Sequence, residues 1–254
     1  MRLIVLASGS SGNTMLIESD GRGVLLDAGI SARETLRRID ACGAMGTRID
    51  AILLTHEHSD HVAGARVLAR RLDIPVIATR GTLHGAERCL ADVPETVGVE
   101  YGDRFEVAGL TVTVFATSHD ATQPAGFTFD GPGYRRVGVL TDTGVVTATA
   151  LEALAGCHVL GIETNHDAVM LERGTYPQFL KRRIAGDQGH LSNDAAAAAL
   201  AQIRWSGLAH VFGLHLSEEN NTHAAASAAL TRIAGDPASP VTTVGRQGGG
   251  VCEL

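Results

Sequence analysis

One stretch decides the fold: residues 51–61 read AILLTHEHSDH. An apolar run of four residues, typical of a buried strand, leads directly into a seven-residue segment that holds three histidines and two acidic residues. Neutral imidazoles and carboxylates are the ligands that zinc, manganese and iron prefer in proteins. The stretch therefore predicts a metal site at the carboxyl end of a strand.

The residues that follow indicate a helix over residues 61–72, with Ser59 as its N-cap. Metal ligands would then lie at a strand end and at a helix start, where active sites are common in α/β folds. The spacing is not His-Glu-x-x-His, because the fourth position after His56 is Asp60. A single-zinc protease site on one helix is therefore the wrong template.

Three further residues of metal-ligand type each follow an apolar run elsewhere in the chain. They are His119 after residues 110–115, Asp142 after residues 136–140, and His215 after residues 209–214. Because strand ends can meet at one edge of a sheet, these side chains are expected to converge on the histidine segment. Residues of metal-ligand type thus follow four predicted strands. This repetition favours a metal site over the alternative, a solvated loop whose histidines bind nothing.

Length and composition fit one domain over residues 1–254, built as two packed halves. No apolar run approaches the length of a transmembrane helix, and the amino-terminus leads straight into a strand. We therefore expect no signal peptide, no membrane partner and a cytoplasmic location. The four cysteines are scattered without a C-x-x-C pair, as expected of thiols in a reducing compartment.

The net charge of −7 counts against a protein that coats nucleic acid through bulk electrostatics. It leaves room for a local basic groove. One basic segment, residues 181–183, lies near Tyr176, Phe179 and His190 in the sequence. A basic and aromatic stretch of this kind suits contact with a nucleic acid strand.

Strand-like and helix-like patterns alternate along the chain, which predicts a layered α/β fold. Strands are expected over residues 3–6, 14–18, 24–27, 51–54, 75–78, 158–163, 209–214 and 241–244, with a strand-rich stretch over 101–140. Helices are expected over residues 32–41, 61–72, 83–90, 147–154, 177–184, 193–203 and 218–233. The three glycines at 248–250 are interpreted as a terminal turn.

These residues together resemble the metallo-β-lactamase superfamily, whose fold places two β-sheets between helix layers in a four-layer αββα sandwich of two similar halves. The resemblance covers essentially the whole chain and rests on residues 26–29 (LDAG), 56–61 (HEHSDH), His119, Asp142 and His215. Within the superfamily the chain is similar to the WalJ/YycJ branch of phosphodiesterases and DNA exonucleases. The branch motifs are residues 6–13 (LASGSSGN), 118–121 (SHDA), 164–167 (TNHD), 180–184 (LKRRI), 189–193 (GHLSN) and 215–221 (HLSEENN).

The resemblance implies two divalent metal ions, zinc or manganese, with iron also acceptable. Its ligand sets are His56, His58 and His119 for the first ion, Asp60, His61 and His215 for the second, and Asp142 as the bridge. The ions would clamp a phosphate and turn a bridging water into hydroxide for in-line attack on phosphorus, with Asp60 counted among the catalytic residues. The chain departs from the branch at Gln178 and Leu83, where an aromatic residue is expected. Its contacts with substrate are therefore expected to differ from those of the branch.

Other residues have a functional interpretation and a structural alternative. Asp27 is expected to orient a ligand histidine, or else to form a turn. His190 is expected to contact the scissile phosphate or to protonate the leaving oxygen, or else to stand solvated at a helix start. His166 is expected to contact substrate or to make a structural hydrogen bond. The candidate substrate contacts are Ser10, Asn13, Asn165, Tyr176 and Lys181.

The leading functional hypothesis is a dinuclear metal-dependent phosphodiesterase that acts on DNA as an exonuclease. A second hypothesis is a small-molecule hydrolase that cuts a lactone, thioester or lactam, because the same metal ligands serve attack on a carbonyl carbon. A third is a metal-binding accessory protein without catalysis, which the complete ligand set disfavours.

Overall fold

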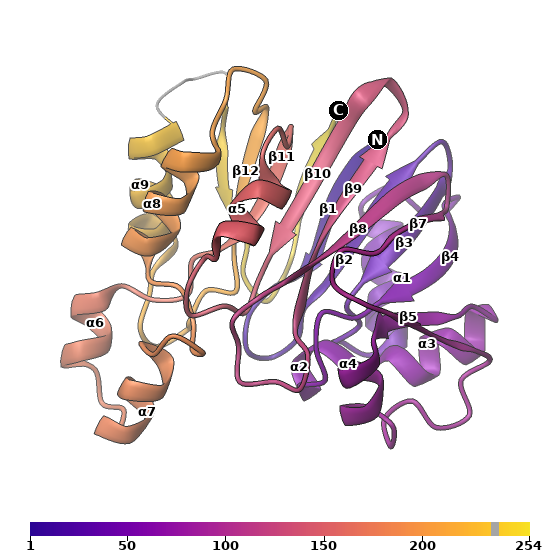
Figure 1. The fold of residues 1–254 in the computed structure, drawn as a ribbon, viewed down its shortest axis with the longest axis horizontal. Coiled ribbons are helices and arrows are strands. Elements are labelled where there is room, and N and C mark those ends of the chain that lie inside the picture. The colour runs from indigo at the N-terminus through magenta and orange to yellow at the C-terminus, as the bar shows by residue number, and fades with distance from the viewer. Residues whose placement is uncertain (235–238) are drawn as a thin grey trace.

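Two seven-stranded β-sheets pack face to face at the centre of the molecule (Figure 1). The structure is a computed structural model that describes residues 1–234 and 239–254. In spatial order, the first sheet contains β14 (Gly250–Glu253), β1 (Arg2–Ala7), β2 (Thr14–Ser19), β3 (Arg22–Leu26), β4 (Arg48–Leu53), β5 (Val76–Thr79) and β6 (Thr96–Val99). The second contains β13 (Val241–Thr243), β12 (His210–Leu214), β11 (Val159–Glu163), β10 (Arg135–Leu140), β9 (Ala125–Gly131), β8 (Leu110–Ala116) and β7 (Arg104–Val107).

Helices cover the outer faces of both sheets (Figure 1). On the first sheet lie α1 (Ala32–Ala41), α3 (Ala65–Leu72) and α4 (Arg80–Gly85), and on the second lie α5 (Ala148–Leu154), α8 (Asn193–Ile203) and α9 (His223–Ala234). The short α2 (Ser59–Val62) lies at one edge of the sandwich, and α6 (Ala168–Arg173) and α7 (Gln178–Ile184) project from that edge. A 3-10 turn, Pro132–Tyr134, joins β9 to β10. The expected αββα sandwich is confirmed.

Alternate side chains of β1 belong to different cores, because both faces of the first sheet are covered. Leu3 and Val5 belong to the core between the sheets, whereas Ile4 and Leu6 belong to the core beneath the helices of the first sheet. Side chains of a strand point alternately to opposite faces, so a strand covered on both sides must be apolar at every position. The buried residues 3–7 of β1 meet this requirement, whereas Arg2 at its start is only half-buried.

The helix expected over residues 61–72 is broken in two, and Ser59 is its first residue rather than its N-cap. The N-cap is His58, whose side chain makes no capping hydrogen bond. The break falls at Gly64, whose N–H donates to the carbonyl of Ala28 at 2.7 Å. A Cβ at Gly64 would lie 2.1 Å from the carbonyl oxygen of Ile30, so this close approach requires glycine.

We expect Gly64→Ala to lower the free energy of unfolding by about 2–3 kcal/mol, because a backbone carbonyl occupies the space of the new methyl group. Urea denaturation measures the change. Gly46→Ala is the matched control, since a Cβ there meets nothing within 4 Å. Equal stability of the two variants would contradict the close-approach argument.

Other expected elements differ at their bounds or were missed. α4 begins earlier than residue 83, because the Thr79 hydroxyl accepts a hydrogen bond from the N–H of Thr82 and caps the helix there. α9 begins at His223 rather than at residue 218. α6 was not predicted, although Asp167 caps it through the N–H groups of Val169 and Met170. β6 and β14 were also missed: each is a short edge strand that pairs with a single neighbour, and β14 follows the predicted glycine turn.

Among the residues that the structure describes, no helix has both the length and the apolar character that crossing a membrane requires.

Candidate metal centre

Strands of both sheets end at one edge of the sandwich, beside α2, and bring imidazoles and carboxylates together there (Figure 1). Residues 56–61 follow β4, His119 follows β8, Asp142 follows β10 and His215 follows β12. The structure places all seven residues of the expected ligand sets in overlapping groups whose ligand atoms lie within 4.8 Å of one another.

The first group contains His56, His58 and His119. His56 Nε2 lies 3.0 Å from His58 Nδ1, and His119 Nε2 lies 3.3 Å from the same nitrogen. Burial and the neighbouring His61 lower the pKa of His56 well below its usual value. The imidazole is therefore neutral, which is the form that binds a metal ion.

The second group contains Asp60, His61 and His215. Asp60 Oδ2 lies 3.4 Å from His61 Nε2 and 3.5 Å from His215 Nε2. Burial raises the pKa of Asp60, but its hydrogen bonds to His215 and His61 outweigh that effect and hold the pKa below the usual value. An ionised carboxylate thus faces two imidazole nitrogens.

Asp142 lies between the two groups. Its Oδ2 is 3.3 Å from His61 Nε2, and its Oδ1 is 4.0 Å from His119 Nε2. The Thr141 hydroxyl donates to Oδ2 at 2.6 Å and fixes the carboxylate. Oδ1 also lies 3.5 Å from His215 Nδ1, so the Asp142 carboxylate is within reach of ligand residues of both groups.

Three residues at the site hold a left-handed backbone conformation that is uncommon for residues other than glycine. Asp27, Asp142 and His215 have φ angles of 59°, 51° and 53°. Asp27 and His215 directly follow β3 and β12, and Asp142 is the second residue after β10, so the left-handed turn redirects the chain at the point where the polar side chain enters the site. Backbone strain of this kind is typical of functional sites.

Asp27 is fully buried and orients His61. Its Oδ2 accepts a hydrogen bond from His61 Nδ1 at 2.7 Å, which leaves Nε2 of the same ring directed at Asp60 and Asp142. The backbone N–H of Thr55 donates to Asp27 Oδ1 at 2.8 Å. These contacts fit the orienting role better than the alternative of a turn-forming aspartate.

Glu163 is a residue of this site that sequence reasoning missed. It ends β11, is fully buried, and accepts hydrogen bonds at Oε1 from Nδ1 of His190 at 2.7 Å and Nδ1 of His215 at 3.0 Å. Its Oε2 accepts from the backbone N–H groups of Thr143 and Leu191. The sequence does contain a signal for Glu163, because this acidic residue ends an apolar strand. A charge buried at such a position needs polar partners.

The centre carries an excess of buried negative charge. Burial lowers the pKa of His215, but the charge of Asp142 and hydrogen bonds to Asp60 and Glu163 raise it to about 10. The pKa of His61 is also raised well above its usual value, because neighbouring carboxylates outweigh the effect of burial. The site thus stabilises positive charge, and its imidazole nitrogens and carboxylate oxygens fit divalent cations.

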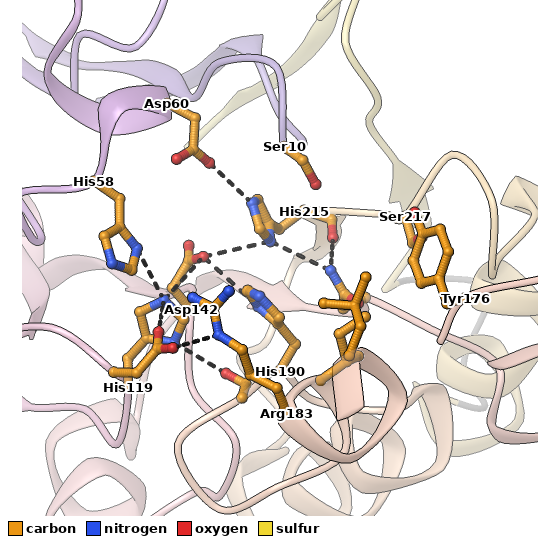
Figure 2. A pocket seen from close by; sticks show the side chains of 15 residues that line it. Ser10, His58, Asp60, His119, Asp142, Tyr176, Arg183, His190, His215 and Ser217 are labelled. Atoms are coloured by element: carbon orange, nitrogen blue, oxygen red, sulfur yellow. Dashed lines mark hydrogen bonds and ion pairs between the residues drawn. The ribbon is translucent and has the colours of Figure 1, made fainter. Parts of the chain in front are cut away.

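A hollow of about 340 Å³ opens onto both groups (Figure 2). Ser10, Tyr176, Arg183, His190 and Ser217 contribute to its wall. In Figure 2, Tyr176 and Ser217 lie on the side opposite His58 and His119. The hollow therefore joins the ligand groups to a wall of hydroxyl, aromatic and cationic side chains.

The structure places Ser10, Asn165, Tyr176 and His190 on this wall, as expected, but three other residues elsewhere. The Asn13 amide is buried and bonds to the Gly9 backbone and to Asp60. Lys181 Nζ donates to the Glu172 carbonyl at 2.6 Å, and Arg183 lines the hollow instead. His166 is buried outside the lining, and its Nδ1 has no hydrogen-bond partner among the described residues.

Comparison with known proteins agrees with this geometry. Residues 22–215 match the family described as "Beta-lactamase superfamily domain", and the chain belongs to this superfamily of metal-dependent hydrolases. It is 35% identical to exodeoxyribonuclease YycJ of Bacillus anthracis, over 90% of this chain and 87% of that protein. It is 34% identical to exodeoxyribonuclease WalJ of Streptococcus pneumoniae, over 85% and 82%. These relatives place it in the WalJ/YycJ branch.

A solved structure has the same fold. Zn²⁺-bound PqqB from Methylobacterium extorquens superposes with a TM-score of 0.75 and 21% identity, and the match covers 100% of both chains.

Proposed function

We propose that the chain is an exonuclease that cleaves the phosphodiester bonds of DNA with two divalent cations. The observation that carries this proposal is the position of Asp142, whose carboxylate oxygens lie 3.3 Å from His61 and 3.5 Å from His215 in one group and 4.0 Å from His119 in the other. A shared carboxylate between two ligand groups suits a two-metal centre that clamps a phosphate. The two relatives named exodeoxyribonucleases support the substrate class.

In this proposal His56, His58 and His119 hold one cation, Asp60, His61 and His215 hold the other, and Asp142 is shared. Bound divalent cations would supply Lewis acidity toward the phosphate and a water of lowered pKa. Zinc and manganese both suit this mixed set of nitrogen and oxygen ligands.

His190 is placed to donate a proton to the leaving oxygen. Its Nδ1 is bonded to Glu163, so Nε2 is the ring nitrogen left for substrate in the hollow. Burial lowers the pKa of His190, but the charge of Glu163 and the hydrogen bond to it raise the pKa above the usual value. The raised pKa favours the protonated imidazole, which is the form that a general acid requires.

The wall of the hollow positions the phosphodiester. Arg183 presents a guanidinium that a salt bridge of 2.7 Å to Asp120 holds in place. Ser10 contributes a hydroxyl donor from the loop between β1 and β2. A cation and a hydroxyl on the wall suit binding of the non-bridging oxygens and of a neighbouring phosphate.

Glu163→Gln is expected to weaken metal binding about 10- to 100-fold, because the carboxylate orients ligand His215 and sets its ring to present Nε2. Competition with a chromophoric chelator measures the affinity. Glu152→Gln, on the exposed face of α5, is the matched control and is expected to bind metal like the wild type. An unchanged affinity in Glu163→Gln would remove this residue from the metal site.

Cleavage of end-labelled single- and double-stranded DNA with Mn²⁺ or Zn²⁺ tests the proposed function, with a lactone and a thioester assayed in parallel. We expect mononucleotides to be released from DNA ends, and EDTA to abolish the release. Turnover of the lactone or thioester without DNA cleavage would establish the small-molecule hydrolase instead. No turnover of any substrate by metal-loaded protein would favour a non-catalytic role.

A further inference from the structure

The outer face of α7 exposes an aromatic side chain beside the hollow. Phe179 is 69% exposed, whereas the other five phenylalanines of the chain are buried or half-buried. No residue of α7 is buried, so this short helix does not use Phe179 to hold itself in the fold. An exposed phenylalanine at this position has no structural role in the described contacts.

Helical spacing places Phe179 next to the residues that line the hollow. Leu180, Arg183 and Ile184 form the lining face of α7. Phe179 is four residues before Arg183 and three before Arg182, so the three side chains share one side of the helix. Phe179 is not itself part of the lining, but it lies only about 6 Å along the helix axis from Arg183, which is.

α7 is joined closely to the loop that carries His190. The backbone N–H of His190 donates to the carbonyl of Ile184 at 2.8 Å. At Gly189 the chain approaches α7 so closely that a Cβ would lie 2.2 Å from the carbonyl oxygens of both Arg183 and Ile184. Phe179 therefore has a fixed position relative to the proposed general acid.

The helix that carries Phe179, α7, is basic, although the protein as a whole is acidic. α7 carries three cationic residues and no acidic one, whereas the whole chain has a net charge of −7. Lys181 bonds to α6 and Arg183 pairs with Asp120, but Arg182 has no ion-pair partner among the described residues. Arg182 lines a second hollow of about 470 Å³, which shares Arg183 and Asp120 with the first.

We propose that Phe179 stacks on a nucleobase next to the scissile phosphate, and that Arg182 binds the phosphate of the following nucleotide. The proposal rests on the nuclease function proposed above and names its substrate as a single-stranded end. An exposed ring flanked by cations is what strands bound without sequence preference require, because every base has a face on which to stack. A base within a duplex is already stacked and paired, so the face favours unpaired ends.

The test compares Phe179→Ala with the wild type on two single-stranded oligonucleotides, one natural and one with abasic sites at its terminal nucleotides. We expect the substitution to raise KM for the natural strand about 5- to 100-fold with little change in kcat. On the abasic strand the two proteins should have equal KM values, because the stacking partner is absent. Phe179→Trp should restore the KM of the wild type.

Tyr134→Ala is the control, since Tyr134 is a 95% exposed aromatic in the turn between β9 and β10, away from the site. Its KM values should match those of the wild type. An unchanged KM in Phe179→Ala, or an equal rise on both strands, would overturn the stacking role while leaving the nuclease function standing. If the wild type cleaves neither single strand but releases nucleotides from duplex DNA, the inference fails and the nuclease function stands. If it cleaves no DNA at all, the proposed function fails as well.

Discussion

Asp142→Asn is expected to lower the rate of phosphodiester cleavage by at least about 10³-fold, the largest effect of any single substitution proposed for this chain. Asp142 lies within reach of ligand residues of both groups, and an amide replaces one of its oxygens with an NH₂ group that cannot bind a cation. The substitution also removes a negative charge from the centre. Steady-state kinetics on an oligonucleotide measure the loss.

Metal analysis of the same variant separates loss of the site from loss of the fold. We expect Asp142→Asn to retain about one cation per chain, because the three-histidine group does not depend on the carboxylate. Asp92→Asn is the control, since this exposed side chain pairs with Arg66 on the surface. Near-normal activity of Asp142→Asn would contradict the shared-carboxylate geometry.

His190→Ala is expected to lower kcat for DNA by about 10²- to 10⁴-fold while bound metal stays unchanged. His190 Nδ1 lies 2.7 Å from Glu163 and 3.7 Å from Asp142, but His190 is not a ligand in either of the two proposed sets. Its removal should therefore take away a proton donor and leave the cations in place. Kinetics and elemental analysis of one preparation provide both measurements.

The leaving group provides a sharper criterion for the role of His190. A nitrophenolate departs without protonation, whereas the alkoxide of a DNA sugar requires a proton. The substitution should therefore slow cleavage of a nitrophenyl phosphodiester much less than cleavage of DNA. Equal losses on the two substrates would indicate that His190 binds phosphate and does not act as the acid.

The convergence of the candidate metal ligands could be predicted because each is a metal-ligand type that comes soon after an apolar run, whereas their division into two ligand sets came from the family resemblance. His119, Asp142 and His215 are separated in the sequence, but the end of a strand fixes which edge of the sheet each one reaches. Helices with local capping signals could also be located well. α1 and α8 begin at the predicted residues, and Ser31 and Ser192 cap them.

The features that could not be predicted depend on contacts between distant segments. At the break, the N–H of Gly64 donates to the distant carbonyl of Ala28, and no local pattern reveals this contact. Lys181 was chosen as a substrate contact from three adjacent cationic residues. The orientation of α7 about its axis directs Lys181 to the Glu172 carbonyl and Arg183 to the hollow. The sequence shows Glu163 only as the last residue of a strand, and its contacts with the imidazoles of His190 and His215 arise from the fold.

Anomalous diffraction from crystals of the protein grown with Mn²⁺ is the most direct test of the two-metal centre. Two peaks are predicted, one among His56, His58 and His119, and the other among Asp60, His61 and His215, with Asp142 in contact with both. A single peak, or peaks remote from these side chains, would contradict the account.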